Sequence, residues 1–461
     1  MGYLPFLIAL AWGILAWRRP RWAVLSLPAC LPIYVWRTHL GPLPTTTLEL
    51  LFIATAFGIT FKSGSKPWQD GWCASAAWRW PILAWLAATL LAIQVAPDHI
   101  AALGLWRAFV LEPLAYFILL QAFLKKEEDH RFVVLALAAS TFFVASWCVI
   151  QYLTGYGIPH PWNTGFLTRR ATGPFPFPNA VSLYCAPLAA LFFGLGMRRL
   201  TTHDSRLSRN FLWLAFFAAT LATLLAKSVG GALSILTAVT TILIAKRRTR
   251  VWTLAALILS MIFVFAVPQL RSPTFNTLTF NGWSGRVRLW MWQETWQMLK
   301  DRPVLGAGLG AYPEVFKPYH IKTFIEIFQY PHNIILNFWS ETGLFGLFAF
   351  AWIVAVWIRT VLGRKSSAVS SKKPTYDLRL TTHDSRLTTY DLRLTTYDLR
   401  LTALPYALPL IAILVQGLVD VPYFKNDLAF AFWIFVALAA SPKPPIAYDP
   451  GQANPAAPIR T

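Results

Sequence analysis

RFVVLALAASTFFVASWCVIQYL, residues 131–153, carries no charge after Arg131 and is long enough to cross a lipid bilayer as one helix. A crossing helix takes roughly 20 apolar residues, because every backbone polar group must be satisfied inside the segment. The whole chain shares this character: of its 461 residues, 56% are hydrophobic and 13% are charged. A soluble fold has too little interior to cover that much apolar surface. The sequence therefore predicts an all-α, polytopic integral membrane protein.

Further apolar runs of similar length occur along the chain. Taken with the first, they give about twelve (12–13) membrane spans, because either of the first two runs can be a re-entrant or interfacial piece. The second contains Pro28 and Pro32, which interrupt a helix. The runs are 3–17, 22–36, 43–61, 80–96, 100–124, 131–153, 178–197, 210–226, 229–245, 251–268, 342–361, 403–420 and 427–441.

The net charge of +21 would suggest nucleic-acid binding in a soluble protein, but here the basic residues gather in alternate loops. By the positive-inside rule these loops face the cytoplasm, and we expect no nucleic-acid partner. They contain Arg18, Arg19, Arg21, Lys62, Lys66, Arg79, Lys125, Lys126, Arg131, Arg198, Arg199, Arg206, Arg209, Lys246, Arg247, Arg248, Arg250 and the stretch after Arg359. The intervening loops, 37–43, 96–99, 154–177, 269–331 and 421–427, are then extracytoplasmic.

The longest polar stretch on the predicted outer side divides the chain. We expect about ten spans in residues 1–268, an extracytoplasmic catalytic loop in 269–341, and the last spans in 342–441. A cytoplasmic insert, 362–402, contains heptads such as TYDLRLT that lack a coiled-coil seam and look like low-complexity sequence. A related copy, THDSRLS, lies at 202–208, and 442–461 reads as a disordered cytoplasmic tail.

Two arginines stand near the start of a predicted helix in the outer loop. Arg286 and Arg288 diverge by about 200° around a straight helix, so they point to different sides. In a first helical turn, free backbone N–H groups would add to their charge and form an anion site. The alternative is that both side chains lie at the lipid surface, as Arg beside Trp often does.

His332 and Asn333 stand at the entry to an apolar helix, in the sequence YPHNIIL. A histidine there can act as general base on a sugar hydroxyl. The alternative is a helix-capping Asn beside a hydrogen-bonded His. Glu341 follows His332 by nine residues and faces away from it unless the helix breaks near Gly343.

Several ionisable residues lie within or beside apolar runs, where an uncompensated charge is costly. They are Glu49, Arg107, Glu112, Lys227 and Asp420. Arg107 and Glu112 are five apart, slightly out of line for a pair on one α-helix. Each of these residues needs a partner or a water-filled cavity.

The four cysteines are Cys30, Cys73, Cys148 and Cys185, and they are spread singly along the chain. They have no paired spacing that holds zinc or defines a disulfide framework. We read them as small apolar packing residues, and we expect neither metal nor cofactor.

Three segments together resemble the O-antigen ligase and O-antigen polymerase family. The first is GRVRLWMWQETWQMLKDRPVLGAGLGAY followed by YPHNIILNFWSETGLFG; the others are RRATGPFPFPNAVSLY (169–184) and QGLVDVPYFKNDLAFAFW (416–433). The resemblance covers about 169–433, and the charge pattern places all three segments on the outer side.

The resemblance implies a membrane glycosyltransferase of lipopolysaccharide and cell-envelope polysaccharide biosynthesis. Such an enzyme moves a glycan from undecaprenyl diphosphate to a lipid, glycan or protein acceptor, on the outer face of the bacterial cytoplasmic (inner) membrane. The mechanism implied is metal-independent and inverting. Arg286 or Arg288 would hold the diphosphate, and His332 would activate the acceptor.

The other candidate substrate-binding residues on that side are Lys227, Asn179, Asn333, Glu341 and Asp420. Lys227 departs from the family, which often has Ser followed by Arg where this chain reads Lys227, Ser228, Val229. A lysine there is a point charge without the bidentate fork of an arginine. The competing function is a polytopic transporter or flippase for an envelope lipid or polysaccharide, although we see no inverted repeat. An inactive scaffold for an envelope complex is a third hypothesis.

Overall fold

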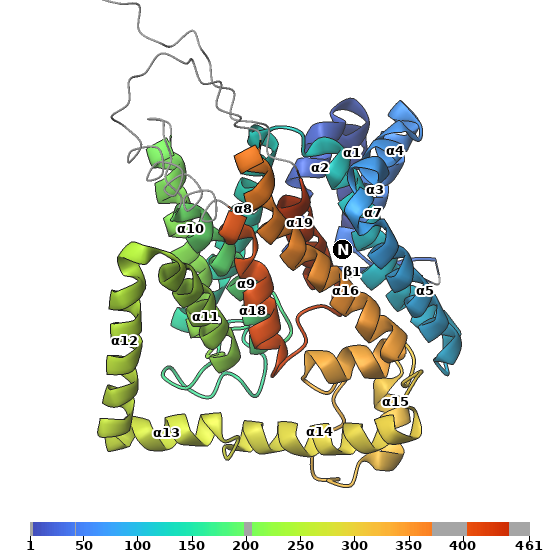
Figure 1. The fold of residues 1–461 in the computed structure, drawn as a ribbon. Coiled ribbons are helices and arrows are strands. Elements are labelled where there is room, and N and C mark those ends of the chain that lie inside the picture. The colour runs from blue at the N-terminus through green and yellow to red at the C-terminus, as the bar shows by residue number, and fades with distance from the viewer. Residues whose placement is uncertain (1–2, 42, 198–204, 371–402, 442–461) are drawn as a thin grey trace, which may run out of the picture.

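The computed structural model describes residues 3–41, 43–197, 205–370 and 403–441, and it is mostly helical (Figure 1). The helices before the middle of the chain are α1 (Leu4–Arg18), α2 (Pro20–Ser26), η1 (Leu27–Val35), α3 (Thr47–Ser63), α4 (Lys66–Ala74), η2 (Ala76–Trp78), α5 (Arg79–Val95), α6 (His99–Trp106), η3 (Arg107–Leu111), α7 (Glu112–Phe123) and α8 (Glu127–Thr154). Those after it are α9 (Pro178–Gly196), α10 (Ser205–Leu225), α11 (Val229–Ala245), α12 (Arg247–Ala266), α13 (Pro268–Leu278), α14 (Trp283–Asp301), α15 (Tyr312–Phe316), η4 (Lys317–Tyr319), α16 (Ile334–Ser370), η5 (Leu404–Tyr406), α18 (Leu408–Gly417) and α19 (Asn426–Ala440). The heptads at 375–402, residues 202–204 of the related copy and the tail 442–461 lie outside the described residues.

The lengths and compositions of the helices are those of a multi-pass membrane protein. Within the described ranges, six helices are long and apolar enough to cross a bilayer: Ala76–Val95, His99–Phe123, Glu127–Thr154, Pro178–Gly196, Arg247–Ala266 and Ile334–Gly363. Five shorter apolar helices accompany them: Leu4–Arg18, Arg209–Leu225, Val229–Ala245, Leu404–Gly417 and Asn426–Ala440. The predicted total of about twelve spans therefore stays a prediction.

The sequence prediction missed a hairpin in the amino-terminal half. Strands β1 (Arg37–Leu40) and β2 (Leu43–Thr46) form a small antiparallel hairpin, so the chain is not purely helical, and the run predicted from residue 43 becomes helical only at Thr47. A capping box fixes that start, since Thr46 and Glu49 bond reciprocally to each other's backbone. The proline-containing run 22–36 is broken into α2 and the 3₁₀ helix η1.

A π-helical turn, η3, lies between α6 and α7 and brings Arg107 into line with Glu112. Arg107 Nε lies 3.3 Å from Glu112 Oε1, and Arg107 Nη2 lies 3.0 Å from Glu49 Oε2. The five-residue spacing that is out of line on an α-helix matches the i to i+5 period of a π turn. The two buried carboxylates thus share one arginine.

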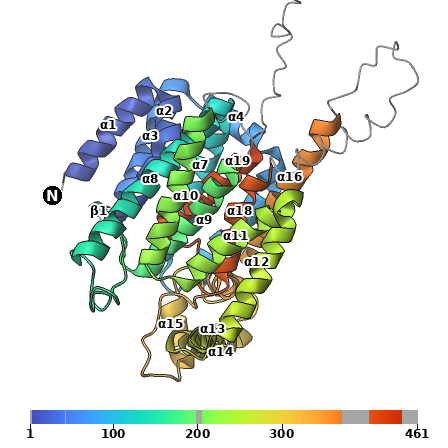
Figure 2. The same cartoon turned by 90° about the vertical axis from the view of Figure 1, so that its left-hand side faces the viewer.

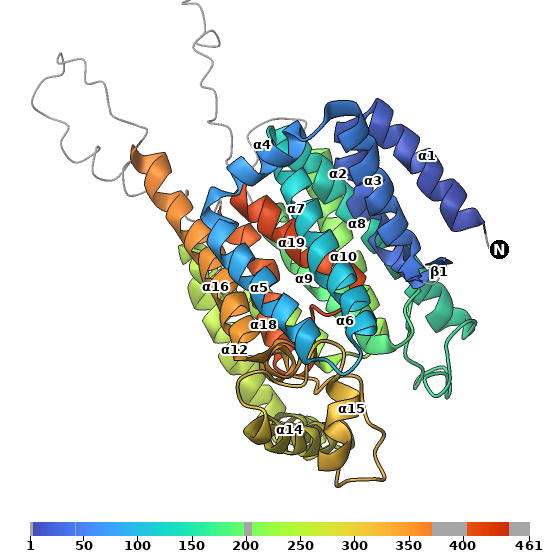
Figure 3. The ribbon, with the colours of Figure 1, turned by 90° about the vertical axis from the view of Figure 1, so that its right-hand side faces the viewer.

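The centre of the bundle is formed by α9 and α19, in which almost every residue is buried (Figure 3). At the opposite extreme, α12 has no buried residue, and its apolar side chains, among them Trp252 and Phe263, face outward. Exposed apolar side chains of this kind are expected where a helix faces lipid. α13 and α14 lie across one end of the bundle, and α4 lies at the other end (Figures 1 and 2).

α16 begins eight residues earlier than the predicted run 342–361 and breaks at Gly343. Gly343 has φ 66° and ψ −175°, a conformation that is essentially restricted to glycine. A Cβ atom built there would lie 2.4 Å from the carbonyl oxygen of Val304. The break lets α16 pack against the loop that follows α14, where Leu344 N donates to Val304 O at 2.9 Å.

We expect Gly343→Ala to destabilise the protein by about 1–3 kcal/mol, from the backbone strain alone, and by more if the clash with Val304 is not relieved. Gly363→Ala is the matched control, because a Cβ at Gly363 meets nothing within 4 Å and its φ is helical. Thermal unfolding of the purified proteins in detergent measures both changes. Equal unfolding temperatures for the two variants would contradict the assignment of strain to Gly343.

Candidate functional site

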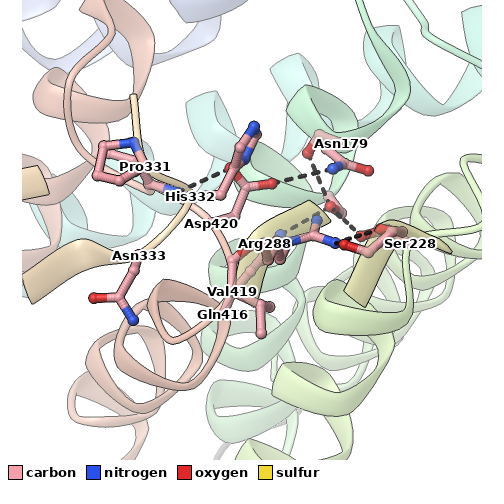
Figure 4. Close-up of polar contacts among 12 residues, drawn as sticks. Asn179, Ser228, Arg288, Pro331, His332, Asn333, Gln416, Val419 and Asp420 are labelled. Atoms are coloured by element: carbon pink, nitrogen blue, oxygen red, sulfur yellow. Dashed lines mark hydrogen bonds and ion pairs between the residues drawn. The ribbon is translucent and has the colours of Figure 1, made fainter. Parts of the chain in front are cut away.

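A polar cluster forms where the ends of several helices meet, on the side of the bundle that α14 crosses (Figure 4). Its members come from the start of α14, the residues before α16, the turn after α18 and the start of α9. The free N–H and C=O groups of helix ends collect at such a place and can hold polar ligands.

Asp420, in the turn after α18, is the centre of the cluster. Its Oδ1 lies 3.1 Å from His332 Nδ1 and accepts a hydrogen bond from Val421 N at 2.9 Å. Its Oδ2 accepts from Asn179 Nδ2 at 3.2 Å. The side chain of Asp420 is 4% exposed, whereas that of His332 is 15% exposed and so remains accessible.

The surroundings of Asp420 favour its ionised form. Burial opposes ionisation, but the hydrogen bond and charge of His332, then the charge of Lys425, hold the pKa of Asp420 below its usual value. An ionised carboxylate only accepts hydrogen bonds, so we infer that His332 Nδ1 carries the proton and Nε2 is the acceptor. His332 also has φ 48°, a strained backbone conformation for a non-glycine residue that is often found at functional sites.

Arg288, on the first turns of α14, lies beside Asp420. Its Nε donates to Val419 O at 2.9 Å, and its Nη1 donates to Ser284 O at 3.1 Å and to the Ser284 hydroxyl. Its Nη2 has no hydrogen-bond acceptor among the described residues. Burial lowers the pKa of Arg288, and the charges of Asp420 and Tyr330 oppose this shift. Arginine nevertheless stays protonated, so the site keeps a positive charge.

Arg170 is a member of the cluster that the sequence analysis missed. Its Nη2 donates to Asn179 Oδ1 at 2.9 Å, and its Nε donates to Ala226 O at 3.0 Å. Burial lowers the pKa of Arg170, and the nearby charge of Arg288 lowers it further. The two guanidinium groups are therefore within electrostatic range of each other. The sequence offered no means of choosing it over Arg169, which instead donates to Tyr152 O at 3.0 Å.

A chain of hydroxyl and amide groups continues from the cluster into the bundle. Gln416 Nε2 donates to Ser182 Oγ at 2.8 Å, and Ser182 Oγ donates to Ser228 Oγ at 2.7 Å. Ser228 also caps α11 by accepting from Gly231 N at 3.3 Å. These contacts join α9, α11 and α18 just beneath Asn179 and Asp420.

The other predicted site residues lie outside this cluster. Asn333 caps α16, accepting from Ile335 N and Leu336 N at 3.0 and 3.1 Å, and its side chain points away from Asp420 (Figure 4). The Lys227 amine is exposed and donates to Leu167 O.

Arg286 is exposed, with no side-chain hydrogen bond to the described residues, as expected from its divergence from Arg288. Glu341 is buried and accepts from Gly310 N, so it anchors the glycine-rich loop after α14 and does not meet His332.

Two further observations delimit the site. Among the described residues, no group of three His, Cys, Asp or Glu side chains is arranged to hold a metal ion. A hollow of about 490 Å³ lies between α5 and α6, away from the cluster, and has a mostly apolar lining: Leu90, Leu91, Ile93, Gln94, His99, Ile100 and Leu103.

Residues 214–351 match the model of a family described as O-antigen ligase. The match begins within α10 and ends within α16, and it includes Arg288 and His332. The predicted family resemblance is thereby confirmed. Asn179, Arg170 and Asp420 lie outside the matched segment, and the structure brings them to it. No curated protein matches the chain.

We expect Arg288→Met to weaken the binding of inorganic pyrophosphate about tenfold to hundredfold, because one hydrogen bond to a charged group is worth about 1.5–3 kcal/mol. Arg286→Met is the matched control, since it removes an exposed arginine two residues away. The rise of the unfolding temperature with pyrophosphate concentration measures binding to each protein. An equal loss in both variants would show that the anion is held by general surface charge.

Proposed function

We propose that this chain, whose residues 214–351 match the O-antigen ligase family model, is a membrane glycosyltransferase. It transfers or polymerises a glycan from an undecaprenyl-diphosphate carrier onto an acceptor hydroxyl, at the outer face of the cytoplasmic membrane. The observation that carries the proposal is the His332–Asp420 pair beside the guanidinium groups of Arg288 and Arg170. This arrangement combines a general base with an anion site, the two elements that such a transfer requires.

In the proposed reaction His332 activates the acceptor. Its Nε2 takes the proton of the acceptor hydroxyl while its Nδ1–H remains bonded to Asp420 Oδ1. Asp420 fixes the tautomer and the orientation of the ring, and its negative charge stabilises the imidazolium that forms. Asn179 and the Val421 amide hold the carboxylate in place.

The departing diphosphate gains one negative charge when its bond to the anomeric carbon breaks. Arg288 and Arg170 lie where they can balance this charge, because the Nη2 atom of Arg288 has no acceptor in the part of the chain that the structure describes and burial strengthens electrostatic attraction. Arginine suits this role, since its planar fork matches two phosphate oxygens. The arginines supply the positive charge that a metal ion supplies in other enzymes, so we propose a metal-independent reaction.

The acceptor oxygen and the departing oxygen occupy opposite sides of the anomeric carbon in a single displacement. The new bond forms as the old one breaks, so the configuration at that carbon inverts. Fixing both substrates in line between His332 and Arg288 supplies a large share of the acceleration. The acceptor is a lipid such as a lipopolysaccharide core, a growing glycan or a protein. The change in the envelope glycans of a deletion strain would distinguish these three acceptors.

We expect His332→Ala to lower glycan transfer about 10²–10⁴-fold, the usual contribution of a general base. Asp420→Asn also slows transfer, because the ring loses its ionised partner. His39→Ala is the control, since His39 is exposed on the hairpin. Transfer is measured by mass spectrometry on protein in lipid vesicles with a lipid-linked glycan, an acceptor and excess EDTA.

Full activity of His332→Ala would refute the role of His332, and loss of wild-type transfer in EDTA would refute metal independence. Translocation of the lipid-linked glycan without transfer would favour the transporter or flippase alternative.

We expect an impermeant maleimide to label Lys317→Cys, made in a Cys73→Ser background, in intact spheroplasts. Lys317 is exposed in η4, on the side that the charge pattern places outside. Cys73, exposed on α4 at the other end of the bundle, should react in the wild-type chain only after the membrane is opened. The remaining cysteines are at least partly buried. The reverse pattern would place the site in the cytoplasm.

A further inference from the structure

Lys425 lies between the site and α19, in a segment whose backbone is fixed. Its amide donates to Tyr423 O at 2.7 Å, and its carbonyl accepts from Ala429 N at 2.8 Å, in the first turn of α19. Asn426 and Asp427 follow it directly and are both buried. The backbone therefore holds the start of this side chain in one place.

The ammonium group of Lys425 points inward. The residue keeps part of its surface exposed, yet Nζ is buried and lies 3.7 Å from the centre of the Phe177 ring. A lysine at a protein surface normally does the opposite, burying its stem and leaving the charge in water. Nζ has no hydrogen-bond acceptor among the described residues, and it lies against two aromatic rings, that of Phe177 and, at 6.0 Å from its centre, that of Tyr330.

Two buried carboxylates account for the inward direction. Asp427 and Asp420 are the negative charges that act on Lys425, although neither forms an ion pair within 4 Å of it among the described residues. Burial lowers the pKa of Lys425 to about 8, and Asp427, then Asp420, oppose this shift. A charge held at this cost without a hydrogen bond is expected where it serves a function and not stability.

We infer that Lys425 is a positioning residue that acts on the reaction through Asp420. Its inward charge, held on the Phe177 ring, adds to the effect of His332 in keeping Asp420 anionic, so that His332 Nδ1 donates to Asp420 and Nε2 stays free to take the acceptor proton. The inference rests on the proposed glycan transfer. Phe177 is two residues before Asn179, so the same short segment holds the lysine and one partner of Asp420.

Other charged and titratable groups also act on this part of the site. They are His332 before α16, Arg288 on α14, Tyr330 beside His332, Arg170 through Asn179, and Asp427 on α19. Only Lys425 is both cationic and buried without a hydrogen bond to the described residues. Its removal therefore changes the charge around Asp420 while leaving the hydrogen bonds of Asp420 intact.

The test compares Lys425→Met, which keeps the length of the side chain and removes its charge, with Lys425→Arg, which keeps the charge. Lys322→Met is the matched control: its Nζ lies 5.7 Å from the centre of the Trp290 ring and it has no contact with Asp420. Three quantities are measured against pH for each protein: glycan transfer, the unfolding temperature, and carbethoxylation of His332 by diethylpyrocarbonate, followed by mass spectrometry.

In Lys425→Met the acid limb of the transfer profile should move up by about one pH unit, because Asp420 binds a proton more readily without the lysine charge. The pH dependence of His332 carbethoxylation should move in the same direction. Lys425→Arg and Lys322→Met should keep the wild-type profiles.

Removing the charge of Lys425 should not lower the stability of the folded protein. The pKa of Lys425 is lower in the folded protein than in the unfolded chain, so the wild type should gain stability as pH rises from about 8 toward 10.5. Lys425→Met should lack this gain and, at neutral pH, unfold at the wild-type temperature or above it. A lower unfolding temperature with equal loss of transfer at every pH would instead show a structural role and overturn the inference.

The carbethoxylation measurement separates the inference from the proposed function, because it requires no transfer. An unchanged labelling profile in Lys425→Met overturns the inference even if the wild type transfers glycan. If the wild type transfers nothing but the labelling profile of Lys425→Met is shifted from that of the wild type, the proposed function is refuted, and the coupling of Lys425 to the His332–Asp420 pair is still supported.

Discussion

The carboxylate of Asp420 is the point on which the site depends. It is buried at the end of α18, and it accepts hydrogen bonds from the segment before α16, from the first turn of α9 and from its own next residue. Three helices distant in sequence therefore have their ends placed by one charge. A buried carboxylate that lost these donors would be strongly destabilising, so the requirement to satisfy it also fixes where His332 and Asn179 lie.

Breaks in helical geometry position the residues around Asp420. His332 and Lys227 have positive φ angles of 48° and 51°, at the points where the chain turns into α16 and α11. Because helix ends leave backbone groups unpaired, the turns bring free donors and acceptors to the same level of the bundle. Val419 O accepts a hydrogen bond from Arg288 Nε, and Ala226 O accepts one from Arg170 Nε. The backbone of these turns thus orients the two guanidinium groups.

The sequence predicted most of the helical segments and four members of the cluster: His332, Arg288, Asn179 and Asp420. Apolar runs and family motifs are local signals, so they could be read directly. Contacts between distant segments could not be read from the sequence in this way. Arg170 and Lys425 stand in quoted segments but have no motif of their own, and their roles depend on which way a side chain turns. The structure also decided the alternatives left open for Asn333 and Glu341. Asn333 caps α16 and donates from Nδ2 to Leu418 O, and Glu341 anchors the glycine-rich loop.

The cations of the site differ in kind, and this difference fits the proposed chemistry. Arg170 and Arg288 keep their charge at every physiological pH even though burial lowers the pKa of each, so they present a constant field to a diphosphate. Lys425, with its pKa lowered to about 8, is a charge that can be lost, and it acts electrostatically on Asp420, the carboxylate that we propose orients the base. A fixed charge suits the leaving group, because the negative charge there must be balanced in every turnover. A titrating charge suits the base, because a small change in its environment shifts the balance between accepting and releasing a proton.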